Sequence, residues 1–218
     1  MNRTRNGLRI PDQNLWTGEL LDLPLFFDWD PIVEDIRLSY SDPTDDDWDH
    51  GLLWVRHGLD RAGKFRWKAI NTPRTRVMMR EHLCMVCSRS CQRPDGRYWW
   101  LFVNDPDIAP DGTSITNLPP TCGACIPESL ATCPRLAERS RVASVAGTSP
   151  YAATVDLYEP GPGDSLPVPA VKVCHEVNVL LDKGSEWLRY ALGKQPWLML
   201  HDLRDEPLVL AEQQEAQP

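Results

Sequence analysis

Two short stretches, Cys84-Met85-Val86-Cys87 and Thr121-Cys122-Gly123-Ala124-Cys125, decide how this sequence is interpreted. Each contains two cysteines separated by two residues, and 34 residues lie between the two pairs. Two such pairs supply four thiolates, the ligand set of a closed tetrahedral zinc site. A closed site leaves no position for water or substrate. We therefore predict one structural Zn²⁺ bound by Cys84, Cys87, Cys122 and Cys125.

Size and composition set the frame for this site. The chain has 218 residues, of which 42% are hydrophobic and 25% charged. This is ordinary globular usage, and it excludes a disordered chain, a collagen and a coiled coil. We find no run of about 18 apolar residues and no apolar stretch behind the basic N-terminus, so we expect no membrane span and no secretory signal. We expect a cytoplasmic protein, where disulfides are rare and seven cysteines favour metal ligation.

The elements next to the cysteine pairs can be placed from local signals. Thr72 and Pro73 predict a helix cap followed by the first helical residue of a helix over 73–82. The apolar run YWWLFV predicts a strand over 98–103, in which Trp99 and Trp100 point to opposite faces. One of these two indoles is expected to pack against the zinc helix. The second cysteine pair opens an amphipathic helix over 125–139.

Strands are predicted on both sides of this region. Before it, we expect a strand at 32–40 and a hairpin with a charged outer face and with Phe65 and Trp67 on the other face. After it, we expect two strands, a helix and a last strand, which together form a ββαβ unit. The predicted hairpin strands are 52–56 and 64–70, and the C-terminal elements are strands 152–158, 168–173 and 197–201 with a helix over 176–192.

The order of knuckle, strand, loop and knuckle at a helix start resembles the treble-clef zinc fold. Over about 74–136 it is also similar to the four-cysteine form of HNH nucleases. That resemblance implies a catalytic histidine on the strand between the knuckles, but residues 98–117 contain none. Without an imidazole there is no general base near neutral pH, and Asp105 and Asp107 are expected to be turn formers. We predict a non-catalytic module and no nuclease activity.

A wider resemblance covers about 74–203. The motif PPxCxxC, followed by Cys133-Pro134, resembles a group of uncharacterised actinobacterial proteins, some of them labelled phage-type. The resemblance implies the zinc site and the architecture but no reaction. We therefore predict an α+β protein: a β-rich N-terminal segment (1–72), a treble-clef-like zinc module (73–143), a C-terminal ββαβ unit (144–210) and a flexible tail (211–218).

Other cysteine chemistry fits the spacing less well. A zinc deaminase needs Cys-x-Glu or His-x-Glu upstream of Pro-Cys-x-x-Cys, whereas Cys174-His175-Glu176 lies downstream and Thr121 separates Pro120 from Cys122. The order of Cys84, Cys87 and Cys91 is the reverse of the radical iron–sulfur spacing. A thioredoxin-like site would not need a second pair.

Three further cysteines are left over. Cys133 follows Cys125 by two helical turns and is expected to share its face in the core. Cys91 could replace a zinc ligand or remain free. Cys174 and His175 could act as nucleophile and base, but adjacent residues on a strand point apart and no orienting acid is evident from the sequence.

Charge is distributed in three blocks. The net charge of −8 combines −8 over residues 1–52, +8 over 53–98 and −8 over 99–218. The blocks could neutralise one another on the folded surface, or the central block could form a basic strip that faces nucleic acid. The strip contains Trp54, Phe65 and Trp67 between the basic residues Arg56, Arg61, Lys64, Arg66, Lys68, Arg74, Arg76 and Arg80.

These observations favour a non-enzymatic, zinc-stabilised recognition protein. Its partner is expected to be DNA or RNA, or a protein, contacted through Arg66, Lys68, Arg74, Arg76 and Arg80. The alternative is a small enzyme of specialised metabolism or phage biology, with a pocket between the zinc module and the C-terminal unit. An open basic strip would favour the first and a deep pocket with convergent polar groups the second.

Overall fold

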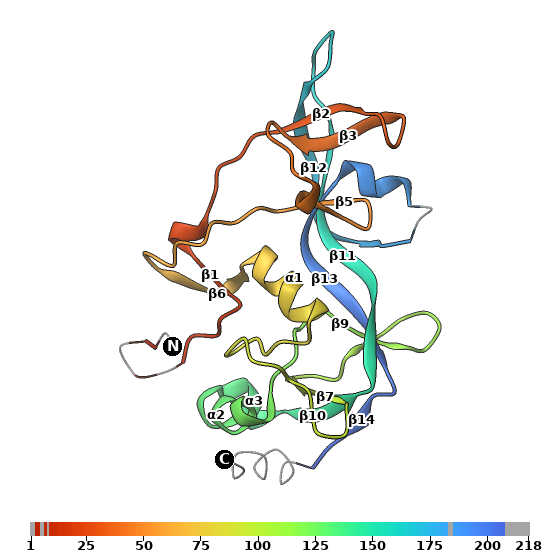
Figure 1. Cartoon of the computed structure of the whole chain (residues 1–218). Helices are drawn as coiled ribbons and strands as arrows, with labels where there is room; N and C mark the ends of the chain where they lie inside the picture. Colours follow the sequence, from red (N-terminus) through yellow and green to blue (C-terminus); the bar gives the residue numbers. More distant parts are fainter. Residues whose placement is uncertain (1–2, 5–6, 8, 183–184, 208–218) are drawn as a thin grey trace.

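A computed structural model describes residues 3–4, 7, 9–182 and 185–207. Two long antiparallel strands, β11 (Gly147–Pro160) and β13 (Ala191–His201), run side by side through the centre of the molecule (Figure 1). Elements from the first half of the chain flank this ribbon at both ends.

The largest sheet contains nine strands of the described part of the chain. Strand β12 (Val168–Leu180) pairs antiparallel with β11 and carries a hairpin from the N-terminal part at its start. On the other side, β13 pairs in parallel with a short strand from the first half. The remaining strands are β2 (Leu25–Asp30), β3 (Asp35–Tyr40), β4 (Trp48–Asp49), β5 (Leu52–Trp54), β8 (Asp107–Ile108) and β9 (Ser114–Thr116). Their order in the main path is β3-β2-β12-β11-β13-β5-β4.

A second sheet lies with the cysteine pairs at the lower end of Figure 1. It consists of β7 (Tyr98–Phe102), β10 (Arg141–Val145) and β14 (Arg204–Asp205), in the order β14-β10-β7. Two short helices, α2 (Ile126–Thr132) and α3 (Pro134–Glu138), connect the second cysteine pair to β10. Strand β7 therefore pairs with a strand that follows the helices, and the strand pair between the knuckles is β8–β9.

The N-terminal segment forms a two-stranded ribbon with the basic block. Strand β1 (Asn14–Trp16) pairs antiparallel with β6 (Phe65–Ile70), which leads into helix α1 (Thr72–Arg80). The Asn71 side chain caps this helix by accepting the Arg74 N–H at 3.1 Å. The predicted cap, Thr72, is displaced by one residue because its hydroxyl instead donates to the Lys194 carbonyl at 2.7 Å. That bond ties α1 to β13.

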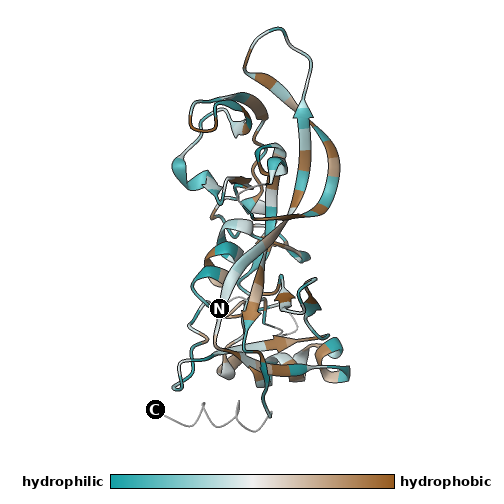
Figure 2. Cartoon of the chain, turned by 90° about the vertical axis from the view of Figure 1, so that its right-hand side faces the viewer, coloured by the Kyte–Doolittle hydropathy of each residue, from teal (hydrophilic) through white to brown (hydrophobic). Residues whose placement is uncertain are grey.

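The core is divided into clusters that follow this layout. Trp99 packs with Cys84, Cys122 and Ile126, whereas Trp100 packs with Phe102, Val145 and Leu200. This confirms that the two indoles point to opposite faces of the strand, one toward the zinc helix. Hydropathy alternates in bands along the β11–β12 hairpin (Figure 2). In β12 only Val168 and Val179 are buried, whereas Val171 and Val173 are exposed.

The predicted C-terminal helix over 176–192 is wrong. Residues up to Leu180 continue β12, and the only helical turn in the described part of this segment is a 3-10 helix over Glu186–Tyr190. Val177 and Val179 are β-branched, alternate along the strand and pair with Val155 and Ala153. Long-range pairing with β11 thus prevails over a short helical pattern. The unit after residue 144 is built on three long strands in the order β12-β11-β13, with β11 pairing antiparallel with both neighbours, instead of ββαβ.

Two other element predictions need correction. The helix over 125–139 is interrupted at Cys133, whose extended backbone precedes Pro134, since proline disfavours the helical conformation of the residue before it. The strands at 52–56 and 64–70 exist in shortened form as β5 and β6, but they do not form a hairpin. β5 pairs with β4 and β13, and β6 pairs with β1.

The structure is mixed and strand-rich, in agreement with the α+β class in its broad form. The proposed boundaries at 72, 143 and 210 remain predictions, and the predicted tail from 211 lies outside the described residues. In the described part of the chain, no helix is long and apolar enough to cross a membrane.

Candidate metal centre

The four predicted cysteines converge at the junction of the two knuckles. The sulfur atoms of Cys84, Cys87, Cys122 and Cys125 all lie within 4.8 Å of one another. The sulfurs of Cys87 and Cys122 are 3.6 Å apart. Zinc–sulfur bonds of about 2.3 Å in a tetrahedron place the sulfurs about 3.8 Å apart, so the observed spacing fits the ion with small adjustments.

Backbone hydrogen bonds shape the first knuckle. The Val86 N–H donates to the Cys84 sulfur at 3.4 Å, and the Ser88 N–H donates to the Cys84 carbonyl at 2.8 Å. Ser88 adopts a positive φ of 58° to close this turn. The Met85 N–H donates to the Pro120 carbonyl at 2.8 Å and so fixes one knuckle against the other.

The second knuckle is a single 3-10 turn that opens helix α2. The N–H groups of Cys125 and Ile126 both donate to the Cys122 carbonyl, at 2.9 and 3.2 Å. This turn brings the two sulfurs of the pair to the same side. Cys122 and Cys125 are buried in a cluster with Trp99 and Ile126, so water has little access to the site.

The protonation of the thiols shows why this donor set suits a cation. Hydrogen bonds from Cys122, Cys125 and Cys87 lower the pKa of Cys84. The hydrogen bond with Cys84 and burial raise the pKa of Cys87, and the bonds with Cys122 and Cys84 raise that of Cys125. Four thiolates this close, three of them on buried cysteines, repel one another unless a divalent ion is bound among them. The residues therefore fit Zn²⁺, which would supply structural cross-linking and no open coordination position.

Arg9 is a member of the site that the sequence did not reveal. Its Nη1 lies 3.4 Å from the Cys125 sulfur and 3.2 Å from Glu128, and its side chain is only 8% exposed. A zinc ion with four thiolates carries a net negative charge, which this guanidinium offsets. No local pattern in the N-terminal segment points to this role, because Arg9 and Cys125 are 116 residues apart.

The remaining cysteines fall outside the quartet. Cys91 is buried next to it and is held by backbone bonds to His82 and Trp99, at 3.0 Å each. Cys133 is half-buried at the break between α2 and α3, short of the full burial expected for a core residue. Cys174 is exposed on β12, distant in topology from the knuckles.

His175 has an acidic neighbour that the sequence did not indicate. Its Nδ1 lies 3.8 Å from the carboxylate of Asp156, which is buried in β11. Asp156 is already paired with Lys172 at 2.6 Å and with Lys194 at 3.5 Å. These contacts assign Asp156 to an ion-pair network that joins the three long strands.

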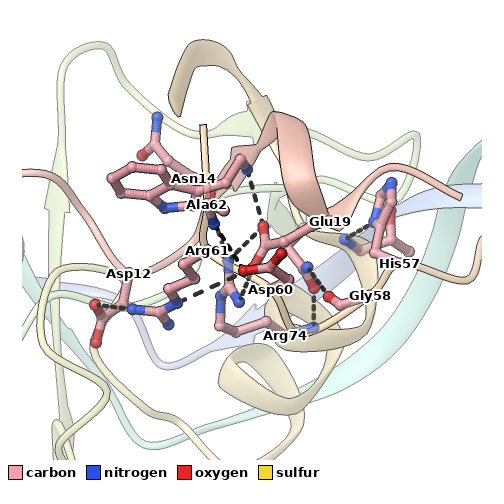
Figure 3. Close-up of polar contacts among 12 residues, drawn as sticks. Asp12, Asn14, Glu19, His57, Gly58, Asp60, Arg61, Ala62 and Arg74 are labelled. Atoms are coloured by element: carbon pink, nitrogen blue, oxygen red, sulfur yellow. Dashed lines mark hydrogen bonds and ion pairs between the residues drawn. The ribbon is translucent and has the colours of Figure 1, made fainter. Parts of the chain in front are cut away.

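The predicted contact residues of α1 are held in ion pairs within the molecule. Arg74 donates to both carboxylate oxygens of the fully buried Glu19, at 2.7 and 3.2 Å (Figure 3). Arg76 pairs with Asp49 at 3.1 Å and lies over the ring of Trp54, and Arg80 pairs with Glu81. Arg56 and Arg61 of the basic strip are likewise paired with acidic residues.

Arg66 and Lys68 have a different environment. Both are exposed on β6, and neither has an ion pair with any residue that the structure describes, which is also true of Lys64. Phe65 and Trp67 contact each other edge to face at 4.8 Å, as expected for one side of a strand. No result bears on binding by Arg66, Lys68, Arg74, Arg76 or Arg80, so their contact role remains a prediction.

Comparison with known proteins adds no assignment: no family model matches the chain, and no match is found among curated proteins or solved structures. The cysteine cluster supports the zinc-knuckle part of the predicted resemblance. The actinobacterial and phage-type part of that resemblance is not shown by any comparison.

Proposed function

We propose that this chain is a zinc-stabilised recognition protein with a treble-clef-like metal module. The support for a structural ion is the closure of the site by four cysteines, three of them buried. All four coordination positions of Zn²⁺ are used by protein ligands, so the ion organises the fold and performs no chemistry.

We further propose that the outer face of β6 binds the sugar–phosphate backbone of a nucleic acid. One observation carries this proposal: of the eight basic residues in the strip, Arg66, Lys68 and Lys64 are those without an ion pair among the described residues. The other five already have carboxylate partners, so phosphate contacts at those positions would cost the ion pairs they replace.

The geometry of β6 limits what such a surface can recognise. Trp67 lies on the other face of the strand, where it lines a cavity with Met85 and Leu101 of the zinc module. It is therefore unable to stack on a base held by the basic face. Contacts to phosphates alone carry no direct sequence information, so binding is expected to be weakly sequence-specific.

The test measures binding of labelled 20-nucleotide DNA and RNA, single- and double-stranded, at low salt. The variant Arg66→Glu/Lys68→Glu is expected to abolish binding. The matched variant Arg135→Glu/Arg139→Glu, on α3 and directly after it, changes net charge equally and should retain binding. Two to three neutralised phosphates predict a slope of about −2 to −3 in log affinity against log salt. Equal loss in both variants, or no binding of any nucleic acid by the unmodified protein, would refute the proposed surface.

A further inference from the structure

A cavity of about 320 Å³ lies where helix α1 faces the central sheet. Four separate parts of the chain line it: the segment 49–54, helix α1 and the residues that follow it, Leu181 directly after β12, and the strands β11 and β13. Helix α1 belongs to the predicted zinc module and β11 and β13 to the predicted C-terminal unit, so the cavity lies between these two parts of the chain. Its volume is at the small end of the range for ligand-binding sites.

One wall of this cavity is polar and centred on Arg76. The guanidinium carbon lies 4.6 Å from the centre of the Trp54 ring, and Nη2 pairs with Asp49 at 3.1 Å. Asp49 is the only acceptor among the described residues that the Arg76 guanidinium reaches with a hydrogen bond. A ligand oxygen that enters the cavity would give this group a second acceptor.

The charge of the lining favours an anion. The lining contains two guanidinium groups, those of Arg76 and Arg80, and the single carboxylate of Asp49; Arg80 also pairs at 2.8 Å with Glu81, which lies outside the lining. Burial lowers the pKa of Arg76 below its ordinary value despite the attraction of Asp49, so the charge is incompletely compensated. The group remains cationic at neutral pH and would gain from a second negative partner.

The opposite wall is apolar and contains a second indole. Met79 and Leu198 are buried at its base, and Pro196 and Leu181 extend it. The Trp197 ring is half-buried, with its Nε1 donating to the Thr154 hydroxyl at 2.9 Å. This bond fixes the orientation of the indole. An apolar wall with a fixed aromatic ring next to a guanidinium suits a flat ring that carries one acidic group.

We infer that this cavity is a binding site for a small aromatic carboxylate, with one or two rings against the apolar wall and the carboxylate on Arg76. The site is independent of the proposed nucleic-acid surface, which lies on β6. The site requires no catalysis. The bound ligand would contact both α1 and β13 and would stabilise the folded protein more as its concentration rises above the dissociation constant.

The experiment titrates the full chain with benzoate and 2-naphthoate, and with benzamide as the neutral isostere of benzoate. Isothermal calorimetry measures affinity, and the indole N–H resonance of Trp197 reports the location. Benzoate is expected to bind at least tenfold more tightly than benzamide, because the neutral amide cannot form an ion pair with a guanidinium. 2-Naphthoate is expected to bind more tightly than benzoate, because its second ring buries more apolar surface.

Two variants locate the carboxylate. Arg76→Gln is expected to weaken benzoate at least tenfold and to reduce its preference over benzamide. The matched control is Arg56→Gln. Like Arg76, Arg56 lies over an aromatic ring, 4.4 Å from the centre of the Tyr40 ring, and pairs with a carboxylate, but it lies outside the cavity. The control is expected to lose stability and keep the affinity of the unmodified protein.

Arg80→Gln covers the case in which Arg76→Gln fails to fold, since Arg80 is 63% exposed and contributes little to folding. It is expected to lower the affinity for benzoate about threefold, because it removes one solvent-screened positive charge from the cavity. The inference is overturned by an absence of binding of both carboxylates at about 10 mM, by equal affinity for benzoate and benzamide, or by unchanged affinity in the Arg80 variant. Arg66→Glu/Lys68→Glu should leave benzoate binding intact, which separates this result from the nucleic-acid test.

Discussion

The cysteine quartet and the Glu19–Arg74 pair solve the same structural problem with opposite chemistry. Each is buried and joins segments that are distant in sequence. The four thiolates of the quartet concentrate negative charge and need a cation from solution; the Arg9 guanidinium offsets only part of this charge. Glu19 instead receives its cation from the chain itself, in a two-point contact with Arg74. One junction should therefore depend on metal supply and the other should not.

The N-terminal segment is the element that connects the two junctions. Arg9 contacts Cys125, the Gln13 N–H donates to the Met85 carbonyl at 3.1 Å, and the Arg74 Nη2 donates to the Asn14 carbonyl at 2.9 Å. Glu19 follows within a few residues. The segment thus lies along the zinc module before it reaches α1, so damage at either end should be detectable at the other.

Loss of a zinc ligand is expected to have the largest effect. Cys122→Ser should remove the bound ion and unfold the metal module, because the free energy of binding structural zinc, about 10 to 16 kcal/mol, contributes to folding. Elemental analysis should find one zinc per chain in the unmodified protein and none in the variant, with loss of near-ultraviolet circular dichroism from Trp99. Cys174→Ser, at an exposed thiol, is the control and should change neither quantity.

Glu19→Gln should have the next largest effect. It leaves the Arg74 guanidinium buried without its counter-ion, a change that costs about 3 to 5 kcal/mol in comparable sites. Urea unfolding should show this loss, whereas zinc content should stay at one per chain. Glu81→Gln removes the carboxylate of an exposed pair with Arg80 and should cost less than about 1 kcal/mol. A similar cost for both variants would show that burial does not distinguish the two pairs.

Arg9→Gln is expected to have a smaller effect, confined to the metal. The variant removes a positive charge next to Cys125 but no ligand, so zinc affinity should fall about tenfold, as for other groups that contact metal ligands. Competition with a chromophoric chelator measures this directly. Arg135→Gln on α3 changes the same charge at an exposed position and should leave the affinity unchanged. An unaltered affinity in Arg9→Gln would mean that the quartet needs no second cation.

The sequence predicted these two junctions unequally. The clustering of the four cysteines was correctly predicted, because the spacing within each pair is a local property of the chain. The position of α1 followed from Pro73, and the opposite faces of Trp99 and Trp100 from strand alternation. Glu19–Arg74 was not predicted, because an ion pair 55 residues apart leaves no local pattern. The basic block was visible in the composition, but which of its members are neutralised depends on the tertiary structure.

The wrong helix over 176–192 has the same cause. Its residues carry a weak helical pattern, and the choice between helix and strand is decided by a partner strand elsewhere in the chain. The break at Cys133 was, in contrast, readable from Pro134 and was missed. Local signals of cysteine spacing and proline position were thus sufficient for the metal module, whereas the sheets needed long-range contacts.

Acidification should produce the smallest effect, at the junction that does not depend on metal. Burial lowers the pKa of His57 from 6.5, and its Nδ1 accepts the Thr72 N–H at 3.0 Å, which requires the neutral ring. Burial acts to raise the pKa of Glu19, but hydrogen bonds from Arg74 and the Trp16 N–H hold it below 4.5. Both groups bind protons more tightly in the unfolded chain, so both lower the free energy of unfolding as the pH falls.

The two groups act in separate pH windows. The contribution of His57 is complete above about pH 6.5 and declines as the pH falls below it; that of Glu19 is complete above 4.5 and declines below it. Urea unfolding between pH 7.5 and 5.5, with zinc content monitored, should therefore show a decrease that His57→Asn reduces, since asparagine keeps an acceptor for Thr72 and does not titrate. His82, whose pKa burial also lowers, should account for part of the remaining decrease. An unchanged slope in His57→Asn would mean that His57 does not contribute to the pH dependence of the junction.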